Sequence, residues 1–130
     1  MTDDELMAEV NSQWDHWAGH FGLQNWLVEF RKVKHTPAFF MEMHLDQDGN
    51  GGYQRVQFLV SPQPEEKIWG SISRNVLHEA IHVVYCYQDL FIRETLAGPS
   101  YAPYGRLIEG NADELTAVIW RLHEQTGCEL

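Results

Sequence analysis

Residues 75–84 read NVLHEAIHVV and place His78 and His82 four positions apart. Within it, residues 75–77 and 83–84, which flank the five-residue segment 78–82, carry no charge and no proline, and the apolar residues around the segment recur every three or four positions. This spacing predicts a helix from about residue 65 to 89. Two residues four apart lie on the same face of a helix, one turn from each other. We therefore expect a helix that presents two imidazoles on one side.

The pair of histidines with Glu79 between them has the spacing of a metal site. Two imidazoles one turn apart can bind one ion at about 2 Å from each nitrogen. A glutamate directly after the first histidine can deprotonate a water that the ion holds. The alternative is a pair of histidines used only in packing. We favour the metal site because the motif lies inside a predicted helix and follows a predicted strand.

A second group of chemistry-bearing residues follows in 109–113, which read EGNAD. A catalytic zinc needs a third protein ligand and one open position for water. Glu109 is our first candidate for that ligand, and Glu114 is the other. Asp113 is one turn after Glu109 and suits a carboxylate that orients a liganding histidine, although it is also a candidate ligand. The alternative is an acidic, solvated helix start.

Together, HEAIH at 78–82 and the downstream Glu109-x-x-x-Asp113 resemble the gluzincin branch of zinc metallopeptidases, in the size of a minimal single-domain zincin. The resemblance covers about residues 53 to 125. It implies Zn²⁺ as cofactor, with His78, His82 and Glu109 as ligands. It also implies that Glu79 is the general base and that Asp113 orients a liganding histidine through a hydrogen bond.

The sequence departs from the gluzincin pattern at two positions. Ile108 stands where the family usually has asparagine, and Asn75 stands where a small or β-branched residue is usual. The metzincin alternative requires a third histidine at position 88, which is Gln88. The gluzincin reading is therefore the better of the two.

Hydrolysis of a peptide bond also needs a donor for the developing oxyanion. Gluzincins use a tyrosine or a histidine there, and Tyr101 and Tyr104 lie in a predicted loop at 98–105. Tyr104 is the better candidate because it is nearer to Glu109. The alternative for each tyrosine is ordinary packing against the core.

The rest of the chain predicts an α+β fold in one domain, 1–130. Thr2 and Glu5 form a capping box for a helix that ends near Gly22. Strands are expected at 26–33, 38–45 and 53–60, and a last helix at 107–124. We expect a zincin-like fold, with a small, mainly antiparallel three-stranded sheet packed by the N-terminal helix and two zinc-bearing helices. The strand at 53–60 either offers an edge to an extended substrate or is a core strand.

Composition excludes several classes of protein. The chain has 9 basic and 19 acidic residues, a formal net charge of -10. Phosphate binding requires a positive field, so we expect neither a nucleic-acid partner nor an anionic membrane surface. No signal segment or membrane span is evident, and two cysteines do not make a disulfide scaffold. These features predict a cytoplasmic protein, and they leave the oligomeric state open.

Two weaker patterns compete with the zinc motif. Within 46–57, Asp46, Asp48, Asn50 and Gly51 match the first half of a calcium loop, but the twelfth position is Gln57 instead of glutamate. A tight hairpin is the better interpretation, and weak calcium binding stays open. His16 and His20 are also four apart, but no carboxylate stands beside them as Glu79 does, so we interpret them as surface or packed residues.

The leading hypothesis is a zinc-dependent metallopeptidase that acts on a peptide or protein substrate. The rival is a non-catalytic zinc-binding structural or regulatory module, for example a phage-encoded one, that acts through a protein partner. The fourth zinc position discriminates between them. An open position favours the enzyme, whereas a fourth protein ligand such as Cys128 or His123 favours the module.

Overall fold

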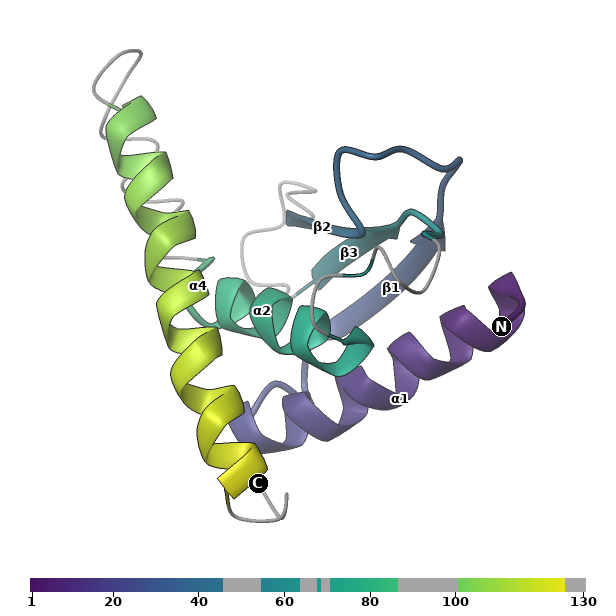
Figure 1. Ribbon diagram of the computed structural model, residues 1–130, viewed down its shortest axis with the longest axis horizontal. Coiled ribbons are helices and arrows are strands. Elements are labelled where there is room, and N and C mark those ends of the chain that lie inside the picture. The colour runs from purple at the N-terminus through teal and green to yellow at the C-terminus, as the bar shows by residue number, and fades with distance from the viewer. Residues whose placement is uncertain (46–54, 64–67, 69–70, 87–100, 126–130) are drawn as a thin grey trace. The chain divides into compact units, whose positions relative to one another are not determined.

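The computed structural model describes residues 1–45, 55–63, 68, 71–86 and 101–125, with the side chains at 45 and 101–104 excepted. The elements follow the order α, β, β, β, α, α that the sequence predicts, and Figure 1 labels each of them. The class is therefore α+β. The chain groups into two compact units, 1–80 and 81–130, with the boundary inside α2 (Ile72–Val84). No helix in the described ranges is long and apolar enough to cross a membrane.

Helix α1 (Asp3–Phe21) begins at the predicted capping box. The hydroxyl of Thr2 accepts a hydrogen bond from the backbone N–H of Glu5, and the Glu5 carboxylate accepts one from the backbone N–H of Thr2, both at 3.1 Å. The bond from the Thr2 backbone N–H lowers the pKa of the Glu5 carboxyl most, because it favours the ionised form, and the Thr2 side chain lowers it further. The helix ends at Gly22, whose φ of 70° is the left-handed conformation that glycine adopts without strain.

The sheet is mixed, which corrects the expected mainly antiparallel arrangement. Its strands are β1 (Leu27–Lys32), β2 (Met41–Leu45) and β3 (Arg55–Val60), in the order β1-β3-β2. β2 and β3 pair antiparallel, but β1 and β3 pair parallel. β1 and β2 are adjacent in sequence but do not pair, because β3 lies between them. They run in opposite directions, so β3 is antiparallel to β2 and parallel to β1.

The central position of β3 also decides its role. Both of its edges are hydrogen-bonded, and its inward residues Val56, Phe58 and Val60 are buried. The segment at 53–60 is therefore a core strand where the structure describes it. The alternative, an edge offered to an extended substrate, is wrong for β3.

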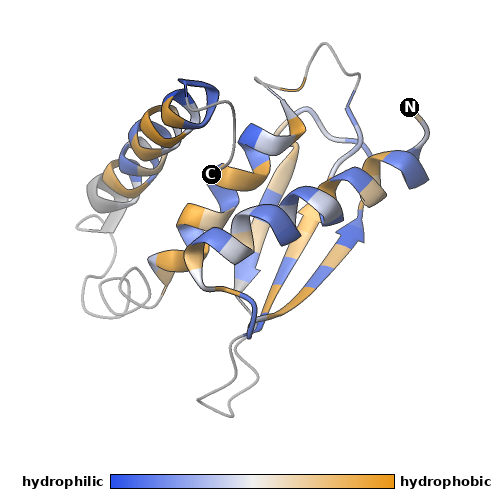
Figure 2. Cartoon of the chain, turned by 90° about the horizontal axis from the view of Figure 1, so that it is seen from below, coloured by the Kyte–Doolittle hydropathy of each residue, from blue (hydrophilic) through white to orange (hydrophobic). Residues whose placement is uncertain are grey.

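One face of the sheet is covered within the 1–80 unit. The Trp14 ring of α1 packs on Phe30 of β1 and Phe58 of β3, with ring centroids 6.2 and 5.2 Å away. The indole N–H of Trp17 donates to the Ser73 hydroxyl at 3.0 Å and so ties α1 to the start of α2. Figure 2 shows α1 lying across the strands, with hydrophobic segments on both elements.

The connection from β1 to β2 is tied to the end of β3 by buried polar groups. The fully buried Ser61 hydroxyl accepts from the backbone N–H of Thr36 at 2.8 Å and donates to the Thr36 carbonyl at 3.1 Å. The side-chain amide of Gln63 donates to the carbonyls of Thr36 and Phe39. The connection therefore keeps its polar groups satisfied although it runs against the core.

Helix α2 begins later than the sequence predicts. Its first residue is Ile72, and the Ser71 hydroxyl accepts from the backbone N–H of Arg74 at 3.1 Å. Ser71 is thus the N-cap, and Ile68 lies in a bend before it. The predicted start near 65 is wrong because Ile68 continues the apolar spacing without being helical. Residues 64–67, 69–70 and 87–89 of the predicted helix lie outside the described ranges.

Helix α4 (Tyr101–Gln125) begins six residues earlier than predicted. Residues 101–105 are helical, so the loop expected at 98–105 is wrong there, and 98–100 lie outside the described ranges. Pro103 misled the prediction. In the first turn of a helix a proline is tolerated, because the N–H groups of that turn have no partner within the helix.

Candidate metal centre

The HEAIH motif lies in the second half of α2, as its spacing predicts. His78 and His82 are one turn apart on one face, and both rings are partly buried. A polar face in the middle of this helix contrasts with the other side, where Val76, Leu77 and Ala80 are fully buried. The helix therefore buries its apolar side in the core and leaves the two imidazoles partly exposed.

Glu109 of α4 meets the second of these histidines. Its Oε2 lies 3.2 Å from Nε2 of His82, within the 81–130 unit. The His82 side chain is 13% exposed and that of Glu109 is 59% exposed. The contact joins a partly buried ring to a carboxylate that solvent also reaches.

The donor atoms of His78, His82 and Glu109 all lie within 4.8 Å of one another. Among the described residues this is the set of three histidine, cysteine or acidic side chains that comes so close. Two neutral imidazole nitrogens and one carboxylate oxygen are a usual donor set for a catalytic Zn²⁺.

The distances fit a single ion. Bonds of 2.0–2.2 Å at tetrahedral angles separate two ligand atoms by about 3.3 Å, and the His82–Glu109 distance is 3.2 Å. Three atoms within 4.8 Å of one another all lie within about 2.8 Å of a common point, so a shift of under about 1 Å would reach bonding distance. The donor set and its spacing are therefore compatible with zinc.

Glu79 stands beside these donors on α2. At 100° per residue its position is about 60° from His82 and 100° from His78 around the helix axis. The residue is only 8% exposed, and glutamates are rarely this buried unless another group pairs with them. A buried carboxylate one position from a potential ligand is the arrangement that the general-base prediction requires.

The other two carboxylates that the sequence offers as ligands lie on the same helix as Glu109. Asp113 is one turn further along α4, and Glu114 follows it; both are exposed. Neither belongs to the three-residue group. The third-ligand role of Glu109 and the supporting role of Asp113 stay predictions, and the geometry favours Glu109 as the ligand.

Several further predictions concern residues that the structure describes only in part. Tyr101 and Tyr104 lie in the first turn of α4, but their side chains lie outside the description, so the oxyanion role is not tested. Cys128 and most of the 46–57 calcium loop also lie outside it. The His123 ring stacks on Trp120 at 5.0 Å, and it is not part of the three-residue group.

No protein-family model, curated protein or solved structure matches this chain. The gluzincin resemblance therefore rests on the motif residues and on their placement.

The remaining histidine pairs lack a third donor in the described part of the chain. His44 contacts Glu42 at 2.7 Å on the exposed face of β2. The rings of His16 and His20 meet edge to face at 4.9 Å beside Trp17. His44 with Glu42 resembles His82 with Glu109 as a pair, which makes it a matched control for metal binding.

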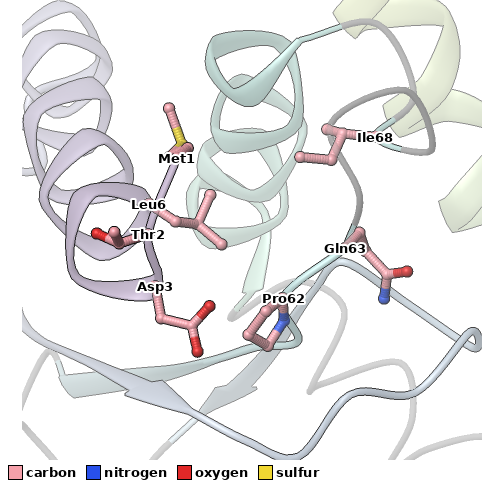
Figure 3. A pocket seen from close by; sticks show the side chains of 7 residues that line it. All are labelled: Met1, Thr2, Asp3, Leu6, Pro62, Gln63 and Ile68. Atoms are coloured by element: carbon pink, nitrogen blue, oxygen red, sulfur yellow. The ribbon is translucent and has the colours of Figure 1, made fainter.

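A small pocket of about 140 Å³ lies in the 1–80 unit, between the start of α1 and the end of β3. Figure 3 shows Asp3 and Gln63 at its polar side and Leu6 and Ile68 at its apolar side. None of the predicted site residues lines it. Its volume is below the usual 300–1,000 Å³ of a ligand site, so it does not compete with the histidine cluster.

The sequence reasoning missed the residues that position α2. Ser71 caps the helix and Ser73 anchors it to Trp17. A serine directly before an apolar periodic run is a signal that could have found the N-cap. The Trp17–Ser73 bond joins residues 56 positions apart, and no local pattern predicts it.

Proposed function

We propose that this chain is a zinc-dependent metallopeptidase of gluzincin type. His78, His82 and Glu109 would hold the metal, and Glu79 would act as the general base. The observation that carries the proposal is the contact of 3.2 Å between Oε2 of Glu109 and Nε2 of His82, a residue of the HEAIH motif. The five-residue motif would supply two ligands, and Glu109 would supply the third that a catalytic zinc needs.

The protein residues divide the chemistry between them. A bound Zn²⁺ supplies a Lewis acid that lowers the pKa of water to about 7. Glu79 takes the proton of the attacking water on a carboxylate oxygen and later gives it to the leaving amine. Helix α2 fixes the spacing of His78 and His82, and both residues are partly buried. The exposure of Glu109 leaves this side of the site open to a substrate.

The first experiment measures zinc and cleavage together. The purified protein is expected to bind one Zn²⁺ and to cleave an unfolded protein or a mixed peptide library. Glu79→Gln keeps the shape of the side chain but removes the base, so it is expected to retain zinc and lose at least about a hundredfold in rate. Elemental analysis measures the metal, and mass spectrometry of the peptides measures cleavage.

His82→Ala and His44→Ala form a matched pair of controls. Each removes a histidine that contacts a glutamate, but only His82 belongs to the three-donor group. His82→Ala should lose the zinc and His44→Ala should keep it. Equal zinc content in all these variants would refute the site. Zinc bound normally, with no cleavage by the parent protein, would refute the peptidase and support the non-catalytic module.

A further inference from the structure

Helix α4 carries a second apolar surface that the metal chemistry does not use. Four large aliphatic side chains on it are 37–56% exposed: Leu107, Leu115, Val118 and Leu122. At 100° per residue they fall, with Asn111, within an arc of about 80°. Figure 2 shows hydrophobic segments recurring along most of α4. We call this surface the α4 stripe, and contiguous exposed apolar surfaces of this kind mark interaction sites.

The stripe has the spacing of a helix–helix seam. Steps of three and four connect Leu115, Val118 and Leu122, and Asn111 precedes Leu115 by four. This 3–4 alternation is what keeps a seam of side chains facing a second helix in a coiled coil. The expected partner is therefore another helix.

The charges beside the stripe identify the partner as a second copy of the same helix. Glu114 and Arg121 are exposed, seven residues apart, and on the same flank of the stripe. If two copies run antiparallel about the midpoint between Leu115 and Val118, each Leu115 meets the Val118 of the second copy. Each Glu114 then lies about 3 Å along the axis from the level of the other copy's Arg121, within reach of both long side chains. Two opposite-charge pairs form by symmetry.

We infer that the α4 stripe is a self-association surface on which two copies of this chain pair antiparallel. The contact is a short one, at the small end of specific interfaces, and the net charge of -10 on each chain opposes it. Association is therefore weak and depends on the two Glu114–Arg121 pairs. Glu109 is about 160° around α4 from the middle of the stripe. Pairing of two copies therefore leaves the Glu109 carboxylate uncovered. The inference does not depend on the proposed peptidase activity.

Sedimentation equilibrium tests the inference on the full chain in about 0.15 M salt, from about 1 µM to 500 µM. The weight-average molar mass is expected to rise with concentration toward twice the mass of the monomer. Val118→Asp is expected to weaken association at least about tenfold because it places two carboxylates in the seam. Leu27→Asp is the control, since Leu27 is exposed to a similar extent but belongs to β1. It should leave the association unchanged.

A charge exchange tests the register and orientation. Glu114→Arg alone, or Arg121→Glu alone, creates two like-charge contacts and should weaken association about tenfold. The combination of both should restore the parent value. These variants change only exposed side chains, so they carry the test even if Val118→Asp does not fold, which circular dichroism would show. A monomer at every concentration would overturn the inference, and so would a double variant as weak as the single ones.

Discussion

Three carboxylates within six residues of α4 are candidates for the third ligand of the proposed metal site. Glu109 has its oxygen 3.2 Å from His82, whereas Asp113 and Glu114 stand outside the three-donor group. Glu109→Gln is therefore expected to lower the zinc affinity at least about a hundredfold, because an amide is a poor ligand. Asp113→Asn should lower it about tenfold to a hundredfold if Asp113 orients a ligand. Titration against a coloured chelator measures both.

Glu114→Gln is the control for this comparison, and it should bind zinc as the parent does. If Glu114→Gln lost the metal and Glu109→Gln kept it, the third ligand would be Glu114. The sequence could predict His78 and His82 because helix geometry alone brings residues four apart together. It could rank Glu109 first among the three carboxylates but could not exclude the other two, since that choice depends on side-chain contacts that no local spacing encodes.

At the scale of elements, the capping box of α1 gives a pH-dependent prediction. The pKa of Glu5 is below its ordinary value of 4.5 in the folded state because of its hydrogen bonds to Thr2. The stabilisation is therefore present above pH 4.5 and is lost as the pH falls through the lower, folded value. Glu5→Gln should unfold more easily than the parent at pH 7, and this difference should shrink and vanish as the pH falls below the lowered pKa of Glu5.

Chemical unfolding of the parent and of Glu5→Gln across this pH range measures the effect. Thr2→Ala removes the hydroxyl acceptor and should cost about 1 kcal/mol at pH 7. A difference between the parent and Glu5→Gln that stays constant to low pH would contradict the proposed role of the carboxylate.

The connection between β1 and β2 gives a second prediction at this scale. Ser61→Ala leaves the backbone N–H of Thr36 without its buried acceptor, and it should lower the free energy of unfolding by about 1–3 kcal/mol. Ser12→Ala is the control, because Ser12 is exposed on α1 and should change stability by less than about 0.5 kcal/mol. Denaturant titration distinguishes the two, and equal small effects would show that the Ser61 network is not needed.

Local chemistry decided which elements were predictable. Thr2 and Glu5 predict the start of α1 and Gly22 predicts its end, and strand-favouring residues between turn signals predict the three strands. Strand direction was not predictable, because alternation looks the same in parallel and antiparallel pairs. The place of β3 between β1 and β2 follows from long-range packing of Phe58 against Trp14 and Phe30. A central strand and an edge strand cannot be told apart from one sequence.

For the molecule as a whole, the net charge and a bound metal would have opposite effects on the stability of the folded chain. A formal charge of -10 destabilises the compact state through repulsion among its acidic groups. A bound Zn²⁺ would add two positive charges beside Glu79 and Glu109 and would stabilise only the folded chain, since the unfolded chain does not bring the ligands together. The proposed metal therefore has a thermodynamic effect that does not depend on any reaction.

Zinc should accordingly raise the unfolding temperature, and chelation should lower it. Free zinc at a hundred times its dissociation constant adds about 2.7 kcal/mol, which for a chain of 130 residues corresponds to about 10 °C. Thermal unfolding of the parent with zinc and with a chelator measures the shift. His82→Ala should show almost none of it, whereas His44→Ala should keep it in full, because His44 pairs with Glu42 without a third donor in the described chain. The same unfolding temperature for the parent in zinc and in chelator would contradict a zinc site at His78, His82 and Glu109.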